Sequence, residues 1–232
     1  MSDFYAKPSG GYAIGSTQGN TNCYRTYDYL TASGYARNCI IGILGNVYGE
    51  SALNPWLWEN NTYNLNNGYG LFQYTPASEY INATSIPNHA PNLSTSIQTI
   101  GADPDDAKGQ LYAFVHDSFG KWLSSCWRSY WSISDYPDLY AMRQHIITTY
   151  GNGSSLTQSQ FASIDNYEDA CFAFLACFEG PAVPNYSTRV NYAQQIKPII
   201  DAYAVDFDIL FLKKFFIDRQ FKNIIIKHDI YS

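Results

Sequence analysis

The stretch ARNCIIGILGNVYGES, residues 36–51, decides the fold expected for this chain. Its apolar side chains recur at three- and four-residue steps, a spacing typical of a helix with one buried face. Gly42 and Gly45 lower the helix propensity of the segment, so we expect them to let another backbone come close. The predicted helix runs from Ala36 to Tyr48 and ends in Gly49-Glu50-Ser51, which places a carboxylate at the end of an apolar helix.

The segment after this helix has the opposite character. Five of the ten residues from Glu59 to Gly68 are Asn, which favours turns over helix. Aromatic residues on both sides, among them Trp58 and Tyr69, are typical of strands, so the segment predicts a small β-hairpin. The expected fold class is therefore α+β, mostly helical, with one β-hairpin directly after the helix that ends at Glu50.

Helical patterns return in the rest of the chain, which divides into an arm (1–21), a main domain (22–203) and an apolar extension (204–232). The extension carries eight large apolar side chains between Phe207 and Ile217. Burying each contributes about 1.5–3 kcal/mol, so we expect residues 204–226 to be ordered and packed on the domain or on a neighbouring subunit. The other predicted helices span 22–32, 107–118, 121–130, 137–150, 167–178 and a segment from Ser187 towards Asp201.

The composition excludes several classes of protein. The net charge of −6 comes without any basic block, which argues against nucleic acid as a partner. No stretch approaches the roughly 18 uninterrupted apolar residues of a membrane span. Residues 1–22 contain no apolar core, so they predict no secretory signal and a protein made in a cytoplasm.

The cysteines and histidines predict neither a disulfide framework nor a metal site. Five cysteines form no CxxC pair, and an odd number in apolar surroundings favours buried, reduced thiols. Four scattered histidines show no metal-binding spacing, so we expect no metal and no cofactor. A Cys/His amidase with Cys39 as nucleophile remains an alternative, although Cys39 sits in an apolar run.

Glu50 is the most informative candidate for chemistry. A carboxylate at the end of an apolar helix, next to a Gly/Asn-rich turn, can be partly desolvated and still open to a ligand. Desolvation raises a carboxyl pKa, which is what a general acid needs near neutral pH. The alternative is an ordinary exposed Glu at a helix end.

Three blocks together resemble the lysozyme superfamily, and most closely the phage tail lysozymes. The first runs from Gly45 through Glu50-Ser51 to Pro55, and the second is GYGLFQYTP, residues 68–76. The third is FLACFEGP, residues 174–181, followed by Arg189 and Ala193. These blocks cover roughly residues 22–200, and in this order and spacing they are fairly specific.

The resemblance implies a lysozyme-like domain that cleaves the β-1,4 bond between N-acetylmuramic acid and N-acetylglucosamine in peptidoglycan. It makes Glu50 the acid that protonates the departing glycosidic oxygen. Tyr69, Gly70, Gln73 and Tyr74 match the segment that binds the sugar. The resemblance also implies a virion component at the phage tail tip, made in the host cytoplasm, that meets the peptidoglycan glycan strand and other tail proteins.

One departure from the family pattern leaves the second carboxylate open. The animal c-type lysozymes carry an Asp two residues before the glycine of this segment, and here that position is Gly68, which argues against a retaining double displacement. Glu59 is the first candidate for a base that activates water; Asp103, Asp105 and Asp106 are the others. Attack by the sugar's own hydroxyl, as in lytic transglycosylases, and a non-catalytic wall-binding module are the alternative functions.

Glu179 also ends an apolar helix and could be a rival acid. The following Gly180-Pro181 predicts a helix terminus instead, with Glu179 paired to Arg189 and fixing the next helix. No Gly/Gln segment of the binding type follows it.

Overall fold

The computed structural model describes residues 4–83, 86 and 106–205, and these residues are mainly helical. The last helical segment covers residues 186–205. The others are α1 (Thr17–Ala32), α2 (Arg37–Ser51), η1 (Glu59–Asn61), α3 (Ala77–Ile81), α5 (Asp106–Val115), α6 (Pro137–Thr149), α7 (Gln158–Ala162), α8 (Tyr167–Phe174) and η2 (Leu175–Glu179), of which η1 is a 3₁₀ turn and η2 a π-helix. Most long helices agree with their predicted ranges, but α1 begins at Thr17, whereas the prediction started this helix at residue 22 and assigned residues 17–21 to the N-terminal arm.

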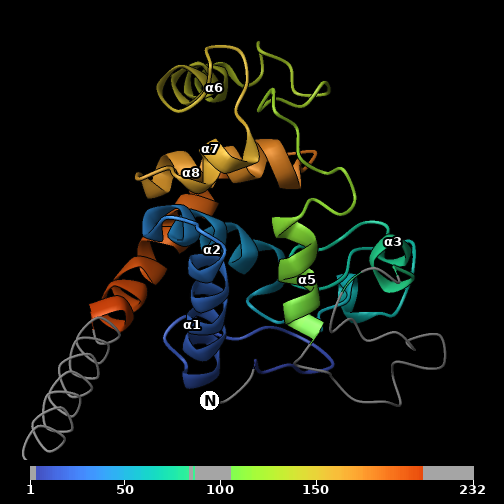
Figure 1. Cartoon of the computed structure of the whole chain (residues 1–232). Helices are drawn as coiled ribbons and strands as arrows, with labels where there is room; N and C mark the ends of the chain where they lie inside the picture. The colour runs from blue at the N-terminus through green and yellow to red at the C-terminus, as the bar shows by residue number, and fades with distance from the viewer. Residues whose placement is uncertain (1–3, 84–85, 87–105, 206–232) are drawn as a thin grey trace, which may run out of the picture.

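Helix α2 is the centre of the molecule, with α8 packed on one side and α1 on the other (Figure 1). Ten of its residues are buried, among them every apolar side chain from Cys39 to Val47. A Cβ on Gly42 would lie 2.6 Å from the backbone nitrogen of Cys171, and one on Gly45 would lie 2.6 Å from the carbonyl oxygen of Arg189. The prediction that these glycines admit neighbouring backbones is confirmed.

The predicted β-hairpin is wrong, since no strand forms within the residues that the structure describes. Only two isolated bridges occur there, Trp58 to Tyr69 and Tyr69 to Tyr74. Asn60 and Asn61 both adopt positive φ in the turn η1, and residues 69–74 fold back on themselves, so no two segments run side by side long enough for a ladder. The aromatic side chains that predicted strands are buried in the core instead.

The helix predicted over residues 121–130 is also wrong, because this segment forms turns. Its polar groups bind the carbonyl end of η2. The backbone N–H of Leu123 donates to Cys177 O (2.6 Å), and the Arg128 guanidinium donates to Ala176 O (2.9 Å) and Phe178 O (2.7 Å). These tertiary hydrogen bonds satisfy carbonyls that a helix end leaves open, and they outweigh local helix propensity.

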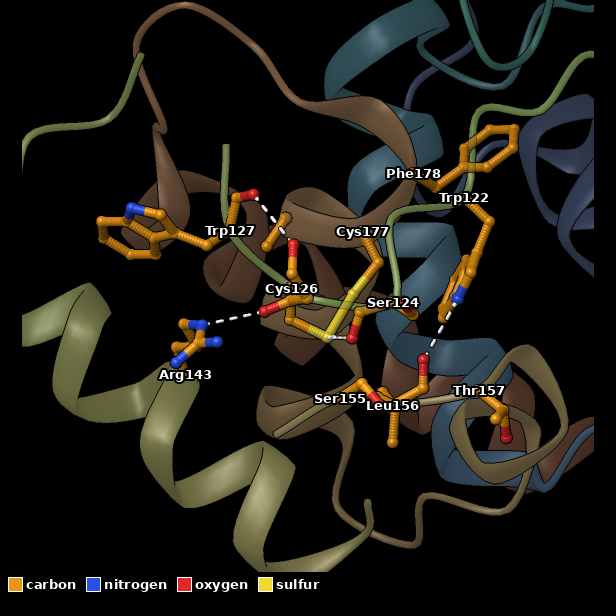
Figure 2. The surroundings of a disulfide bond; sticks show 12 residues. Trp122, Ser124, Cys126, Trp127, Arg143, Ser155, Leu156, Thr157, Cys177 and Phe178 are labelled. Atoms are coloured by element: carbon orange, nitrogen blue, oxygen red, sulfur yellow. Dashed lines mark hydrogen bonds between the residues drawn. A yellow bond between two sulfur atoms is a disulfide. The ribbon is translucent and has the colours of Figure 1, made fainter. Parts of the chain in front are cut away.

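A disulfide joins the same two segments, contrary to the expectation of reduced thiols. Cys126 and Cys177 are bonded, with their Cα atoms 4.5 Å apart, whereas Cys23, Cys39 and Cys171 are free and buried. Figure 2 shows the bond beside Trp122, whose Nε1 donates to Leu156 O (3.3 Å). Nothing in the local sequence marks this pair, because the two cysteines meet only through the folded loop.

The N-terminal arm packs beside the turn that follows α2. Asn22 holds it through hydrogen bonds with both backbone groups of Tyr5, and the N–H of Tyr12 donates to Ala52 O (2.8 Å). None of the helices within the described ranges is long and apolar enough to cross a membrane. The predicted packing of residues 204–226 falls, apart from Ala204 and Val205, outside the described residues.

Candidate active site

One pocket collects the three glutamates that the sequence singled out. It has a volume of about 710 Å³ and opens between the end of α2, the loop 68–75 and the end of η2. Glu50, Glu59 and Glu179 all line it, together with Gln73 and nine other residues, of which Lys121 comes from a separate segment. The chain therefore brings together side chains that are far apart in the sequence.

Glu50 lies in the last turn of α2 and forms an ion pair with Arg189. Its side chain is 21% exposed and that of Arg189 is 10% exposed, so the pair is largely withdrawn from water. Arg189 Nη1 also donates to Asn46 O (3.2 Å), which ties the guanidinium to α2 one turn before Glu50. The predicted pairing of Arg189 with Glu179 is wrong, because Arg189 pairs with Glu50.

Glycines on α2 make room for this arginine. A Cβ on Gly49 would lie 1.3 Å from Arg189 Nη1, so only glycine lets the guanidinium rest against the helix. Ala193, one turn further along the segment 186–205, packs where a Cβ on Gly45 would fall. Two glycines four residues apart on α2 thus face Arg189 and Ala193, which are four residues apart on the segment 186–205. The four residues form one contact between two helices.

Two opposing effects act on the Glu50 carboxyl. Desolvation by burial raises its pKa and is the larger effect, while the charge and hydrogen bond of Arg189 lower it. The nearby Glu59 carboxylate raises the pKa further. The net shift is upward, in the direction that suits a proton donor.

Glu59 lies at the mouth of the pocket and is exposed to water. Its Oε2 accepts from Gly68 N (2.9 Å), and its own N–H donates to Gly68 O (2.9 Å). The two-way contact fixes the carboxylate beside the residue that replaces the expected Asp. Among the alternatives, Asp106 is fully buried and accepts from Tyr69, Tyr80 and Gln110, so it braces the core; Asp103 and Asp105 lie outside the described residues.

The predicted sugar-binding residues divide into two groups. Gln73 and Tyr74 line the pocket, and the Gln73 amide also holds the loop by donating to Leu57 O (3.1 Å) and Gly70 O (3.0 Å). Tyr69 is fully buried, with its hydroxyl donating to Asp106 (2.6 Å), and Gly70 packs against the Gln110 side chain. Tyr69 and Gly70 therefore support the wall of the pocket, and direct contact between them and a sugar stays a prediction.

Glu179 ends a helix as predicted, but the sequence did not reveal that its carboxyl is buried without a partner beside the pocket. It is the last residue of η2, with Gly180 in the left-handed conformation as its cap. Both carboxylate oxygens are buried without a hydrogen-bond partner, although the residue borders the same pocket as Glu50. Burial raises its pKa well above the ordinary value, and the charge of Glu50 raises it further, against smaller opposite effects from Arg189 and Arg128. The π-helix was the missed signal, because π-turns often occur at functional sites.

The contacts of the other candidates argue against a role in catalysis or binding. Cys39 is fully buried and its thiol donates to Phe161 O (3.2 Å); burial raises the pKa of this thiol, which is the reverse of what a nucleophile needs. A second hollow beside Arg37 and Lys197 has its charges paired internally, since both cations reach Asp201. Fold and site together thus define a mainly helical domain with a partly buried carboxyl that lines a pocket.

The comparison with known families agrees with this class. The family model described as phage tail lysozyme matches residues 21–200, so the chain belongs to the phage tail lysozyme family. The chain is also similar to Morphogenesis protein 1 of Bacillus phage B103, with 42% identity over 62 residues. That match covers 26% of this chain and only 17% of the phage B103 protein.

Proposed function

We propose that this chain is a peptidoglycan muramidase that cleaves β-1,4 bonds between N-acetylmuramic acid and N-acetylglucosamine, with Glu50 as the general acid. The observation that carries the proposal is the position of Glu50: a partly buried carboxyl of raised pKa lines a pocket of about 710 Å³, and a second, exposed carboxylate, Glu59, lines the same pocket. Family membership supports a peptidoglycan substrate.

Each carboxylate has a distinct task in the proposed mechanism. Protonated Glu50 gives its proton to the departing glycosidic oxygen. Glu59, which is open to water and fixed by Gly68, takes a proton from the water that attacks the anomeric carbon. This division of labour is the general one for glycosidases that use an acid and a base, and Gly68 offers no carboxylate for a covalent intermediate.

Replacement of Glu50 by Gln tests the proposal. Loss of a general acid costs about 100- to 10,000-fold in rate, so Glu50→Gln should bind purified cell wall and fail to clear it in a zymogram. Glu168→Gln, an exposed carboxylate on α8 away from the pocket, is the matched control and should clear wall like the parent. Equal clearing by Glu50→Gln would remove Glu50 from the mechanism.

A lytic transglycosylase with the same acid is the second candidate, because Gly68 replaces the expected Asp. In that reaction the sugar's own hydroxyl attacks, and the product is lighter by one water. Mass spectrometry of the released muropeptides separates the two reactions. Wild-type protein that binds wall and clears none would instead favour a non-catalytic wall-binding module.

We further propose that the protein acts from the virion, at the tail tip, and opens the host wall during infection. The support is the family itself and the name of the phage B103 relative, which is a morphogenesis protein. Purified virions should contain the chain, and antibodies against it should label the tail tip. Its absence from purified virions would contradict this assignment.

A further inference from the structure

Four buried polar atoms beside Glu50 have no hydrogen-bond partner within the described residues. They are both carboxylate oxygens of Glu179, the Oδ1 of Asn46 and the Nε of Arg189. Such groups are costly when they stay unpaired, so each one calls for an explanation. All belong to the elements that meet behind the pocket: α2, the end of η2 and the segment 186–205.

The surrounding structure holds Glu179 in place at this junction. The π-helix η2 ends there, and its carbonyls are fixed by Leu123 and Arg128 while the disulfide ties Cys177 to the neighbouring loop. A Cβ on Gly180 would lie 2.1 Å from Arg128 Nε, so the arginine rests directly on the residue after Glu179. A tightly held carboxyl with no partner is unusual for a residue that serves only to end a helix.

The charged groups around this carboxyl come from three elements. Glu50 approaches from α2, Arg189 from the segment 186–205 and Arg128 from the loop before α6. The Cys171 thiol of α8 also lies near enough for the Glu179 charge to raise its pKa. Glu50, in turn, is faced by Arg189 and by Glu59. The charge of the Arg189 guanidinium thus acts on both carboxyls, while its ion pair is with Glu50.

We propose that Glu179 is a positioning residue for the acid: Glu50 and Glu179 share Arg189 and one proton, and the proton rests on Glu50 when Arg189 turns its charge to Glu179. The structure shows the other arrangement, with Arg189 on Glu50 and Glu179 without a partner. The unpaired Nε of Arg189 is the donor available for the exchange. This inference rests on the proposed role of Glu50.

The sharing explains how an acid can work beside an arginine. A guanidinium in contact with a single carboxylate favours the ionised form, which cannot donate a proton. A second buried carboxylate takes over the guanidinium and leaves Glu50 free to be protonated. Arg128 favours the same state, because its charge stabilises an ionised Glu179.

A titration that needs no activity provides the first test. Protein labelled with ¹³C at the glutamate carboxyls is titrated as wild type and as Glu50→Gln, with Glu179 assigned from its loss in Glu179→Gln or Glu179→Asp. Without Glu50, Arg189 has only Glu179 to pair with, so the Glu179 midpoint should fall by about one pH unit or more. An unchanged midpoint would overturn the proposal, whether or not the protein cleaves peptidoglycan.

The pH profile of wall cleavage provides the second test. In Glu179→Gln, Arg189 stays on Glu50, so the alkaline limb of kcat/KM should move to lower pH by about one unit or more. Glu179→Asp should move it back towards the parent, and Glu168→Gln should leave it unchanged. An unmoved limb in Glu179→Gln would show a merely structural role. A parent protein that cleaves no glycan would contradict the proposed function. The titration would still test whether Glu50 and Glu179 share Arg189 and one proton.

Discussion

At the scale of single residues, the site is an arrangement of charges around one helix end. Glu50 lies in the last turn of an apolar helix. This local pattern left an ordinary exposed Glu as the alternative, and the three-block resemblance singled Glu50 out; its role as the acid stays a prediction. Glu179 follows an equally apolar helix, but its chemistry depends on Arg189 and Arg128, which reach it only in the folded chain. Sequence reasoning paired Arg189 with Glu179, whereas the folded chain pairs it with Glu50, because no local pattern ranks the two glutamates.

The titration of Glu179 has a consequence for stability. Burial raises its pKa well above the ordinary value of 4.5, so above pH 4.5 the folded protein keeps a proton that the unfolded chain releases. The folded state then binds more protons, and stability falls as pH rises from 4.5 through the raised pKa. We expect the free energy of unfolding of Glu179→Gln to vary less than that of the parent between about pH 5 and about pH 8. Urea unfolding at both pH values measures this. An equal change in the free energy of unfolding with pH in the parent and the variant would contradict it.

At the scale of elements, regular apolar spacing predicted helices correctly wherever tertiary contacts did not override the local preference of the chain. The helices α2, α5, α6 and the α8–η2 unit agree with their predicted ranges to within a few residues. The aromatic segments around residues 58–74 and 121–130 did not follow their local propensity. Aromatic side chains pack equally well in a core made of turns, so they do not distinguish a strand or a helix from a folded loop.

The Cys126–Cys177 bond gives a prediction at this scale. It closes a loop across a sequence separation of 51 residues, for which the expected stabilisation is about 2–4 kcal/mol. A reductant should therefore lower the free energy of unfolding of the parent by about that amount. The double variant Cys126→Ala, Cys177→Ala should be less stable from the start and insensitive to the reductant. A parent that the reductant does not affect would argue against the bond.

At the scale of the whole molecule, the pocket is assembled from parts that the chain order keeps apart. Three segments each contribute one wall: the end of α2, the loop 68–75 and the end of η2. The helices are stacked in the order α6, α8, α2 and α1, and this packing holds the walls in place (Figure 1). The three motifs that carried the resemblance are these same segments. For that reason the sequence could predict which segments line the pocket, although it could not predict the shape of the walls; that the pocket is the catalytic site stays a prediction.

The central claim is that the chain cuts the glycan and not the peptides of the wall. Glycan strands stripped of their stem peptides test it most directly, because an amidase or peptidase has no bond to cut there. The parent protein should shorten these strands and create new chain ends at muramic acid, while Glu50→Gln should leave their length unchanged. Unshortened strands with the parent, or equal shortening by Glu50→Gln, would contradict the claim.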